Sequence, residues 1–332
     1  MLLREMPRIP HGGRLRQAAH DYRIPLQHWL DLSTGLAPDG WPVPALPAEV
    51  WRRLPEDDDG LGLASLAYFG NIPVLPVAGS QAAIQALPQL FAPCRVGILS
   101  PCYAEHLRAW RMGGHEVIEI HDEITDAVPG NVDILVLSNP NNPTGITLSP
   151  ATLLGWHAQL AARGGLLVVD EAFMDATPEA SILAQATVPG LVILRSLGKF
   201  FGLAGLRCGF VAAEPALLQR LDNLLGPWGV SHPARWITQR ALADRPWQQQ
   251  QRGRLLRAAN DLARLLLDAG LPSPSGCALF RWVPTREAAM LAGRLAQHGI
   301  LVRSFAEGLR FGLPHQATDC DRLRTTLREV LA

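Results

Sequence analysis

One lysine of this chain lies where its side chain would act as a nucleophile. Lys199 ends an apolar run and stands between Leu197 and Phe200. Burial among such side chains disfavours the ammonium form, and the neutral amine can form a Schiff base with an aldehyde. Ser196, three residues earlier, and Arg207, eight residues later, are suitable ligands for a phosphate. An aldehyde that carries a phosphate is pyridoxal 5'-phosphate (PLP). The alternative is a lysine and an arginine in surface ion pairs.

Two further polar segments directly follow buried runs. Residues 139–145 (NPNNPTG) come after the apolar residues 132–138, and residues 170–173 (DEAF) come after the apolar residues 166–169. Open α/β sheets bind their ligands beyond the carboxyl ends of their strands. The sequence therefore predicts that both segments lie at one ligand site.

In their order and spacing, these three segments resemble the fold-type I PLP enzymes of the aspartate and histidinol-phosphate aminotransferase group. The resemblance covers nearly the whole chain. It implies an α/β fold, with a three-layer α/β/α mostly parallel sheet and a smaller α+β domain. It also implies a homodimer.

The resemblance assigns roles around the cofactor ring. It makes Lys199 the Schiff-base lysine and a proton carrier, and it makes Asp170 the partner of the pyridine nitrogen, which turns the ring into an electron sink. Asp170 could instead cap a helix, as aspartates after strands often do. Asn142 matches the donor to the phenolic oxygen of the ring, and Tyr103 matches the aromatic residue stacked on its face.

The cofactor phosphate is expected at a helix start. Gly79, Ser80 and Gln81 precede a helical pattern, and a helix N-terminus offers free backbone amides to an anion. With Ser196 and Arg207 they would form the phosphate cup. His106 matches a histidine near the Asp170 position of relatives, with a surface histidine as the alternative.

Two positions depart from the family pattern. Phe173 stands where many relatives carry a tyrosine that reaches the phenolic oxygen, so we expect a raised pKa of the Schiff base. Leu54 stands where relatives place a tyrosine that reaches the cofactor phosphate across the dimer interface. That contact is therefore absent or made by another group.

The substrate residues are expected in the last part of the chain and in its opening. Arg310 matches the family arginine that holds the substrate α-carboxylate with a bidentate fork, and Arg303 is a second cation nearby or a solvated strand-end arginine. The opening, His11, Gly12 and Gly13 followed by residues 29–40, resembles the threonine-phosphate decarboxylases of cobalamin biosynthesis. These residues could close over a substrate phosphate. Arg14 replaces an asparagine of relatives.

This resemblance implies a PLP-dependent carboxy-lyase. The expected reaction is decarboxylation of L-threonine O-3-phosphate to (R)-1-aminopropan-2-yl phosphate. A histidinol-phosphate-type aminotransferase would use the same residues, so it remains the alternative. A third possibility is a protein of this fold that has lost catalysis and serves as a regulator, which the retained lysine and its partners disfavour.

Composition favours a cytoplasmic enzyme. The chain has 332 residues, with 30 basic and 30 acidic side chains, a balance that argues against nucleic-acid or membrane partners recognised by bulk charge. We expect no bound metal, no leader and, for lack of a long enough apolar stretch, no membrane span. The cysteines form no Cys-x-x-Cys pair and suit a reducing compartment as inert thiols; they are Cys94, Cys102, Cys208, Cys277 and Cys320.

Alternating patterns predict the elements that carry these residues. Buried strands are expected at residues 96–100, 132–138, 166–170, 191–195 and 208–213, and a helix capped by Ser149 at residues 150–163. After residue 276 we expect strands at 277–283, 300–303 and 309–312 and a helix at 286–298. The predicted division is an N-terminal arm with part of the small domain (1–40), a large PLP-binding domain (41–225) and a C-terminal small domain (226–332).

Overall fold

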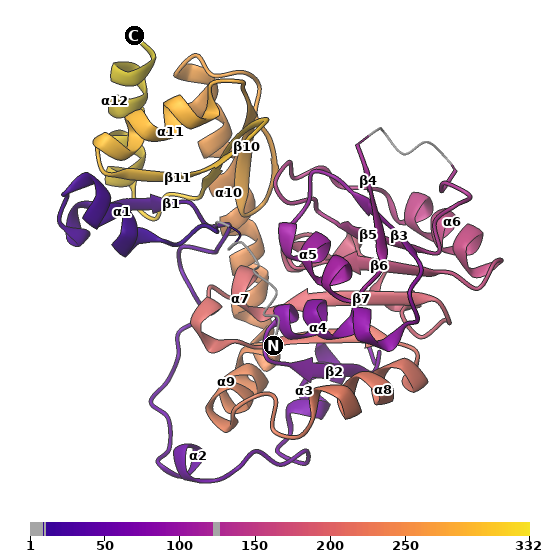
Figure 1. The fold of residues 1–332 in the computed structure, drawn as a ribbon. Coiled ribbons are helices and arrows are strands. Elements are labelled where there is room, and N and C mark those ends of the chain that lie inside the picture. Colours follow the sequence, from indigo (N-terminus) through magenta and orange to yellow (C-terminus); the bar gives the residue numbers. More distant parts are fainter. Residues whose placement is uncertain (1–8, 10, 122–126) are drawn as a thin grey trace, which may run out of the picture.

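The computed structural model describes residues 9, 11–121 and 127–332, which form two β-sheets with helices around them (Figure 1). The larger sheet has the strand order β2-β8-β7-β6-β5-β3-β4. Its strands are β2 (Val74–Val77), β3 (Arg95–Leu99), β4 (Glu116–Ile120), β5 (Ile134–Ser138), β6 (Leu166–Asp170), β7 (Leu191–Ser196) and β8 (Gly209–Ala213).

The larger sheet is mostly parallel, as the sequence predicted. Only β8 runs against its neighbours, β2 and β7. Strands β5, β6 and β7 are parallel, and Ser138 at the end of β5 is paired with Asp170 at the end of β6. The polar residues that follow these strands therefore meet at one edge of the sheet.

Side-chain alternation along the strands divides the core into two layers. Odd-numbered residues of β6 and β7, such as Val169 and Ile193, pack with one set of helices, and even-numbered ones, such as Val168 and Leu194, pack with the other. The first set is α3 (Leu61–Tyr68), α6 (Pro150–Ala161), α9 (His232–Ala243) and α10 (Arg245–Asp268). The second is α4 (Ser80–Ala86), α5 (Ala104–Met112) and α8 (Pro215–Leu225).

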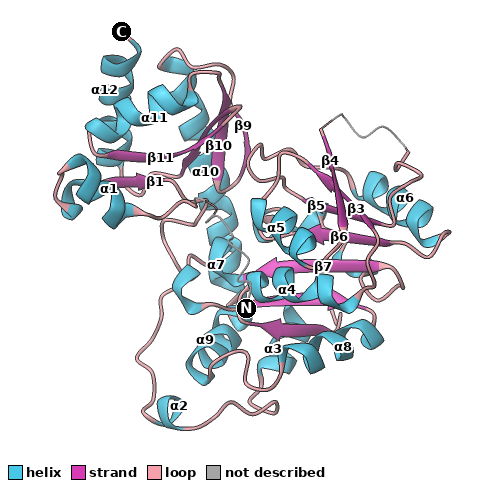
Figure 2. Ribbon diagram, viewed as in Figure 1, coloured by secondary structure: helices cyan, strands magenta, loops and turns pink. Residues whose placement is uncertain are grey.

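The smaller sheet combines β1, from near the start of the chain, with four strands from near its end. Its strand order is β1-β11-β12-β10-β9 (Figure 2). Its strands are β1 (Leu30–Leu32), β9 (Ser275–Cys277), β10 (Phe280–Pro284), β11 (Ile300–Phe305) and β12 (Gly308–Gly312). Helices α1 (Leu15–Tyr22), α11 (Ala288–Gln297) and α12 (Ala317–Leu331) accompany it.

Helix α10 connects the two parts of the molecule. It contacts the segment after β6, which belongs to the larger sheet and its helices. It also contacts β10 and α12, which belong to the smaller sheet and its helices. Helix α9, which begins after residue 226, packs against α3. The division at residues 40 and 225 remains a proposal. Within the described residues, no helix has the length and apolar character needed to cross a membrane.

Most predicted elements are present, and one is wrong. The apolar run 277–283 forms no single strand, because Ala278 and Leu279 turn the chain and Phe280 pairs back onto Cys277 in the antiparallel pair β9–β10. Strands β1, β2 and β4 carried no clear pattern and were not predicted. Helix α6 begins as expected, with the hydroxyl of Ser149 accepting the N–H of Thr152 at 3.1 Å.

Candidate active site

A cavity opens at the edge where β5, β6 and β7 end. Its volume is about 620 Å³, counted out to its open mouth. Almost every cofactor residue predicted from the sequence lines it. The lining residues are Ser80, Gln81, Tyr103, Ser138, Asn142, Asp170, Ala172, Phe173, Ser196, Lys199 and Arg207.

Lys199 lies on the short helix α7 (Leu197–Phe200), which follows β7 without a loop. Its amine lies 5.4 Å from the centre of the Phe173 ring. Burial lowers the pKa of Lys199 to about 8; Arg310 and Arg207 act in the same direction and Asp170 opposes them. The neutral amine, which is the form that attacks an aldehyde, is therefore far more populated near neutral pH than it is in an ordinary lysine, and it predominates above about pH 8.

Asp170 is held from two sides. Nε2 of His106, from α5, lies 3.0 Å from one carboxylate oxygen, and the N–H of Ala172 donates to the other at 3.0 Å. His106 is buried, so the surface alternative for this histidine is wrong. A carboxylate fixed in this way suits a protonated ring nitrogen. The bond to Ala172 is a local turn contact and caps no helix, and the role of Asp170 at the ring nitrogen stays a prediction.

Tyr103 belongs to a chain of hydrogen bonds across the cavity. Its hydroxyl donates to Gln81 at 3.0 Å, and the amide of Gln81 donates to the buried Glu105 at 3.2 Å. Burial, with the charges of Glu105 and Asp170, raises the pKa of Tyr103 to about 12. The phenol is therefore neutral, and its ring is fixed against the cavity as a stacking residue requires.

The predicted phosphate cup is assembled around the start of α4. The first turn of a helix leaves its N–H groups without partners inside the helix, and here these belong to Ser80 and Gln81. Gly79 has φ of 71°, and a Cβ there would lie 2.6 Å from the guanidinium of Arg207. This backbone conformation favours glycine, and a larger residue would displace the guanidinium of Arg207 from the turn. Ser196 completes the group at the end of β7.

Arg310, on the smaller sheet, contacts a residue that lines the cavity. Its guanidinium donates to Oδ1 of Asn142 at 2.6 Å and to the carbonyl of Ser33 at 3.0 Å. Asn142 then keeps its amide as a donor for a ligand. Arg303 is paired directly opposite Arg310 on β11 and β12. Burial, followed by the charge of Arg303, lowers the pKa of Arg310 to about 10. Two arginine side chains are therefore close enough to repel each other at this point of the smaller sheet.

The opening of the chain, at residues 11–13, lies against Ser33, the residue whose carbonyl accepts from Arg310. The N–H of Gly13 donates to the hydroxyl of Ser33 at 2.8 Å, and a Cβ on Gly12 would lie 2.4 Å from the Ser33 carbonyl oxygen. Nε2 of His11 lies 2.9 Å from the carboxylate of Glu105. His11 therefore has a protein carboxylate as its partner, where the sequence had suggested a substrate phosphate.

The departures from the family pattern are visible in the structure. The ring of Phe173 packs against Phe280, 5.1 Å between centres, and offers no donor to the cavity. Leu54 is 61% exposed, so contacts within this chain do not bury it.

Cys102 follows the end of β3, near the cavity. Burial raises the pKa of Cys102 to about 12, which leaves it an unreactive thiol.

Three features escaped sequence reasoning. Lys199 is the only lysine of the chain, a signal that was available in the composition. Ser33 links the opening of the chain to Arg310, and Glu105 links His11 to Gln81. Neither contact has a sequence signal, because each joins segments that are distant along the chain.

The donor set fits PLP. The cavity offers one amine of low pKa, one carboxylate held by a histidine, one aromatic face, and a helix start with an arginine beside it. These match an aldehyde, a ring nitrogen, a ring face and a phosphate in turn.

Comparisons with known proteins agree with this site. The sequence pattern of the family described as aminotransferase class I and II matches residues 63–327. The chain is 53% identical over 321 residues to the threonine-phosphate decarboxylase of Pseudomonas aeruginosa, and the alignment covers 96% of this chain and 97% of the relative.

Solved structures share the fold. The L-threonine-O-3-phosphate decarboxylase of Porphyromonas gingivalis has a TM-score of 0.73 and 25% identity, covering 90% of this chain and 98% of that one. The histidinol-phosphate aminotransferase of Sinorhizobium meliloti, solved in complex with pyridoxal-5'-phosphate, has a TM-score of 0.69 and 21% identity, covering 96% and 85%. The chain belongs to the aminotransferase class I and II family and, within it, to the threonine-phosphate decarboxylases.

Proposed function

We propose that the protein is a PLP-dependent carboxy-lyase of cobalamin biosynthesis. It removes CO2 from L-threonine O-3-phosphate and releases (R)-1-aminopropan-2-yl phosphate. The observation that carries this proposal is the 53% identity, over 96% of the chain, to a threonine-phosphate decarboxylase. The buried lysine and the paired arginines of the smaller sheet support it.

When bound, PLP supplies the aldehyde that captures the substrate amine and the ring that takes up the electron pair left at Cα. In this chain Lys199 would hold the aldehyde and Asp170 the ring nitrogen. The amide of Asn142 would donate to the phenolic oxygen, and Tyr103 would cover the ring face. The phosphate would be held by Gly79, Ser80, Gln81, Ser196 and Arg207.

Proton transfer falls to Lys199. The Nζ atom of Lys199 would hold a proton and deliver it to Cα after CO2 has left. A pKa of about 8 lets this nitrogen both gain and lose a proton near neutral pH. Asp170, held by His106, would keep a proton on the ring nitrogen.

The substrate is anchored at both ends. Arg310 binds the α-carboxylate, and Arg303 binds the phosphate together with the amide of Gly12, because the N–H of Gly13 already donates to Ser33. Like charges directly opposite each other on neighbouring strands are destabilising. An anionic ligand between Arg303 and Arg310 relieves this repulsion. Two fixed ends also fix the rotation at Cα, which decides which bond breaks.

A histidinol-phosphate-type aminotransferase is the second candidate. The chain is 29% identical to a histidinol-phosphate aminotransferase of Burkholderia pseudomallei over 349 residues, and this reaction would use the same lysine and aspartate. It differs by removing the Cα proton and by needing a keto acid as second substrate.

We further propose a homodimer in the cytoplasm. The exposed Leu54 lies where relatives place a tyrosine that crosses the dimer interface. All five cysteines are unpaired, which suits a reducing compartment.

The test is incubation of the holoenzyme with O-phospho-L-threonine without a keto acid. We expect CO2 and an amine phosphate, with a much poorer reaction of unphosphorylated threonine, because threonine lacks the phosphate that Arg303 would bind. Conversion of histidinol phosphate that depends on 2-oxoglutarate, with no CO2 from O-phosphothreonine, would establish the second candidate instead.

A further inference from the structure

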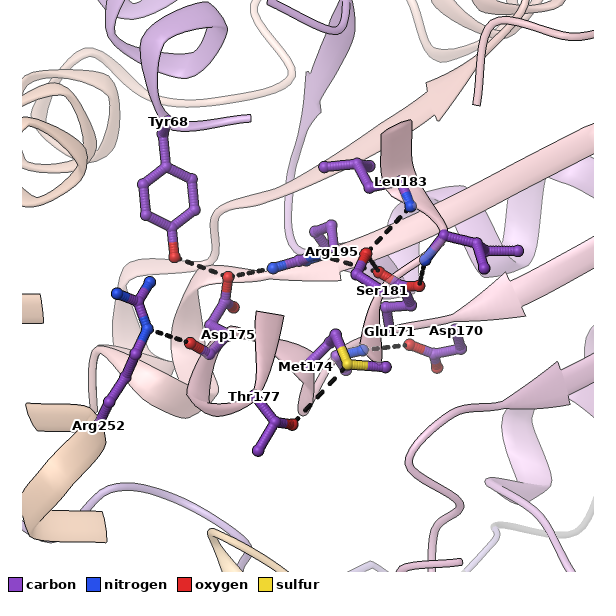
Figure 3. A network of polar contacts seen from close by, with 12 residues as sticks. Tyr68, Asp170, Glu171, Met174, Asp175, Thr177, Ser181, Leu183, Arg195 and Arg252 are labelled. Atoms are coloured by element: carbon purple, nitrogen blue, oxygen red, sulfur yellow. Dashed lines mark hydrogen bonds and ion pairs between the residues drawn. The ribbon is translucent and has the colours of Figure 1, made fainter. Parts of the chain in front are cut away.

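A network of buried charges lies behind the active site (Figure 3). Arg195 is the centre: it donates to Glu171 at 3.0 Å and also to Asp175. The hydroxyl of Tyr68, from α3, donates to Asp175 at 2.7 Å. Glu171, Asp175 and Arg195 are at most 4% exposed. None of them lines the cofactor cavity.

The network and the active site occupy opposite faces of the same two strand ends. Glu171 directly follows Asp170, and Arg195 directly precedes Ser196. Successive side chains of an extended chain point to opposite faces. Asp170 and Ser196 therefore face the cofactor cavity, while Glu171 and Arg195 face the core that contains α3 and α10.

The same charged residues hold the segment that follows Asp170, residues 171–182, in a folded-back conformation. Glu171 accepts the hydroxyl of Ser181 and the N–H of Ile182, the latter at 3.0 Å. Arg195 joins this segment to β7 through both Glu171 and Asp175. The distance between the ends of β6 and β7 is thus fixed by ionic contacts in addition to the backbone ladder.

Arg252 connects the network to helix α10. Its Nε donates to the carbonyl of Asp175 at 3.0 Å, and its guanidinium lies 5.6 Å from the centre of the Phe200 ring. Phe200 is the neighbour of Lys199. Further along α10, the carbonyl of Ala259 accepts Nε of Arg281 from β10 at 2.6 Å. One helix therefore touches the segment after Asp170, the neighbour of Lys199 and the sheet that carries Arg310.

Stability alone does not account for this arrangement. Burying charges has a desolvation cost that their attraction only roughly offsets, and apolar residues of similar size often serve as well. Nε of Arg195 even lacks a partner among the described residues. What an ionic network adds is a defined geometry, with directions and distances that apolar packing leaves looser.

We infer that Tyr68, Glu171, Asp175, Arg195 and Arg252 form a positioning network for Asp170 and Lys199, with Arg252 as its link to α10. None of these five residues lines the cofactor cavity. They hold the ends of β6 and β7 so that the carboxylate and the amine meet the cofactor at the right separation. The inference rests on the proposed roles of Lys199 and Asp170.

The test compares Arg252→Gln with Arg254→Gln. Arg254 lies on the same helix and is exposed, so its variant is a matched control for lost charge on α10. For Arg252→Gln we expect kcat to fall about tenfold with KM changed less than about twofold, because the reacting groups are displaced while the substrate anchors remain. Tyr68→Phe, which loses one hydroxyl, should show the same split to a smaller degree.

A second readout needs no activity. In the apo-protein we expect the amides of Ala172, Ile182 and Leu183 to exchange hydrogen about tenfold faster in Arg252→Gln than in Arg254→Gln, because their acceptors Asp170, Glu171 and Ser181 belong to the held segment. Equal exchange in both variants, or equal kcat, would overturn the inference. If the unsubstituted protein and Arg254→Gln both failed to decarboxylate O-phospho-L-threonine, the proposed function would be contradicted. The hydrogen-exchange comparison would then decide by itself whether the network holds this segment.

Discussion

At the scale of single residues, the protonation of Lys199 is the most direct prediction. Its pKa of about 8 lies below the usual value of 10.5, so the neutral amine predominates above about pH 8. The rate at which PLP attaches to the apo-protein should therefore rise with pH up to about 8 and then level off. Stopped-flow absorbance follows the attachment.

Borohydride then fixes the cofactor to its amine. Since Lys199 is the only lysine, peptide mapping has a single side chain to find. An attachment rate that still rises tenfold per pH unit through about pH 10 would show an ordinary lysine. A label confined to the terminal amine would show that Lys199 is not the attachment site.

Gly79 tests the phosphate cup at the same scale. Gly79→Ala places a Cβ 2.6 Å from the Arg207 guanidinium and strains a backbone with φ of 71°. Loss of a charge-assisted phosphate contact is worth roughly 1.5–3 kcal/mol, so the Kd for PLP should rise about tenfold or more. Fluorescence titration of the apo-protein measures it.

Gly62→Ala is the matched control for that substitution. Gly62 lies in α3 with nothing within 4 Å of an added Cβ. PLP affinity should be unchanged there, because the helix gains a better helix former far from the cup. Equal affinities of the two variants would mean that Arg207 does not hold the phosphate.

At the scale of elements, the sequence indicated the site because its elements are simple. Strands β5 to β7 are continuous apolar runs, each followed by its polar residues, and a parallel sheet brings such ends together. Chemistry-bearing residues on these ends, such as Asp170 and Lys199, could therefore be placed.

Contacts between distant segments could not be read in this way. The partner of His11 is Glu105, and the partner of Gly13 is Ser33. These contacts depend on how the chain opening folds over α5 and β1, which no local pattern records. The turn at Ala278 and Leu279 was missed for a related reason, since two apolar residues give no turn signal.

Strands β11 and β12 carry the element-scale prediction. Their register places Arg303 opposite Arg310, and burial, with the charge of Arg14, lowers the pKa of Arg303. Arg303→Gln should raise KM for O-phosphothreonine about tenfold or more, because a charge-assisted contact to the phosphate is lost. The poor reaction of unphosphorylated threonine should stay as it is.

Arg16→Gln is the control for this substitution. Arg16 is exposed on α1, two residues after Arg14, and should leave KM unchanged. Steady-state kinetics on both substrates separates the cases. A KM that rises equally for threonine and its phosphate would show that Arg303 does not read the phosphate.

At the scale of the whole molecule, the reaction depends on two parts held together. Asp170 ends a strand of the large sheet, Lys199 lies on the helix that follows the next strand, and Arg303 and Arg310 lie on the small sheet. Contacts of Arg310 with Asn142 and of α10 with both parts set their separation. Because the cofactor supports either reaction, we expect this arrangement to decide whether the carboxylate or the Cα proton leaves.

That choice can be measured on one substrate. O-phospho-L-threonine with deuterium at Cα is incubated with the holoenzyme, and the product is analysed by mass spectrometry. Decarboxylation breaks only the bond to the carboxylate, so the account predicts an amine phosphate that keeps the deuterium and lacks the carboxyl group. Loss of the deuterium with the carboxyl group retained would show removal of the Cα proton and would contradict the central claim.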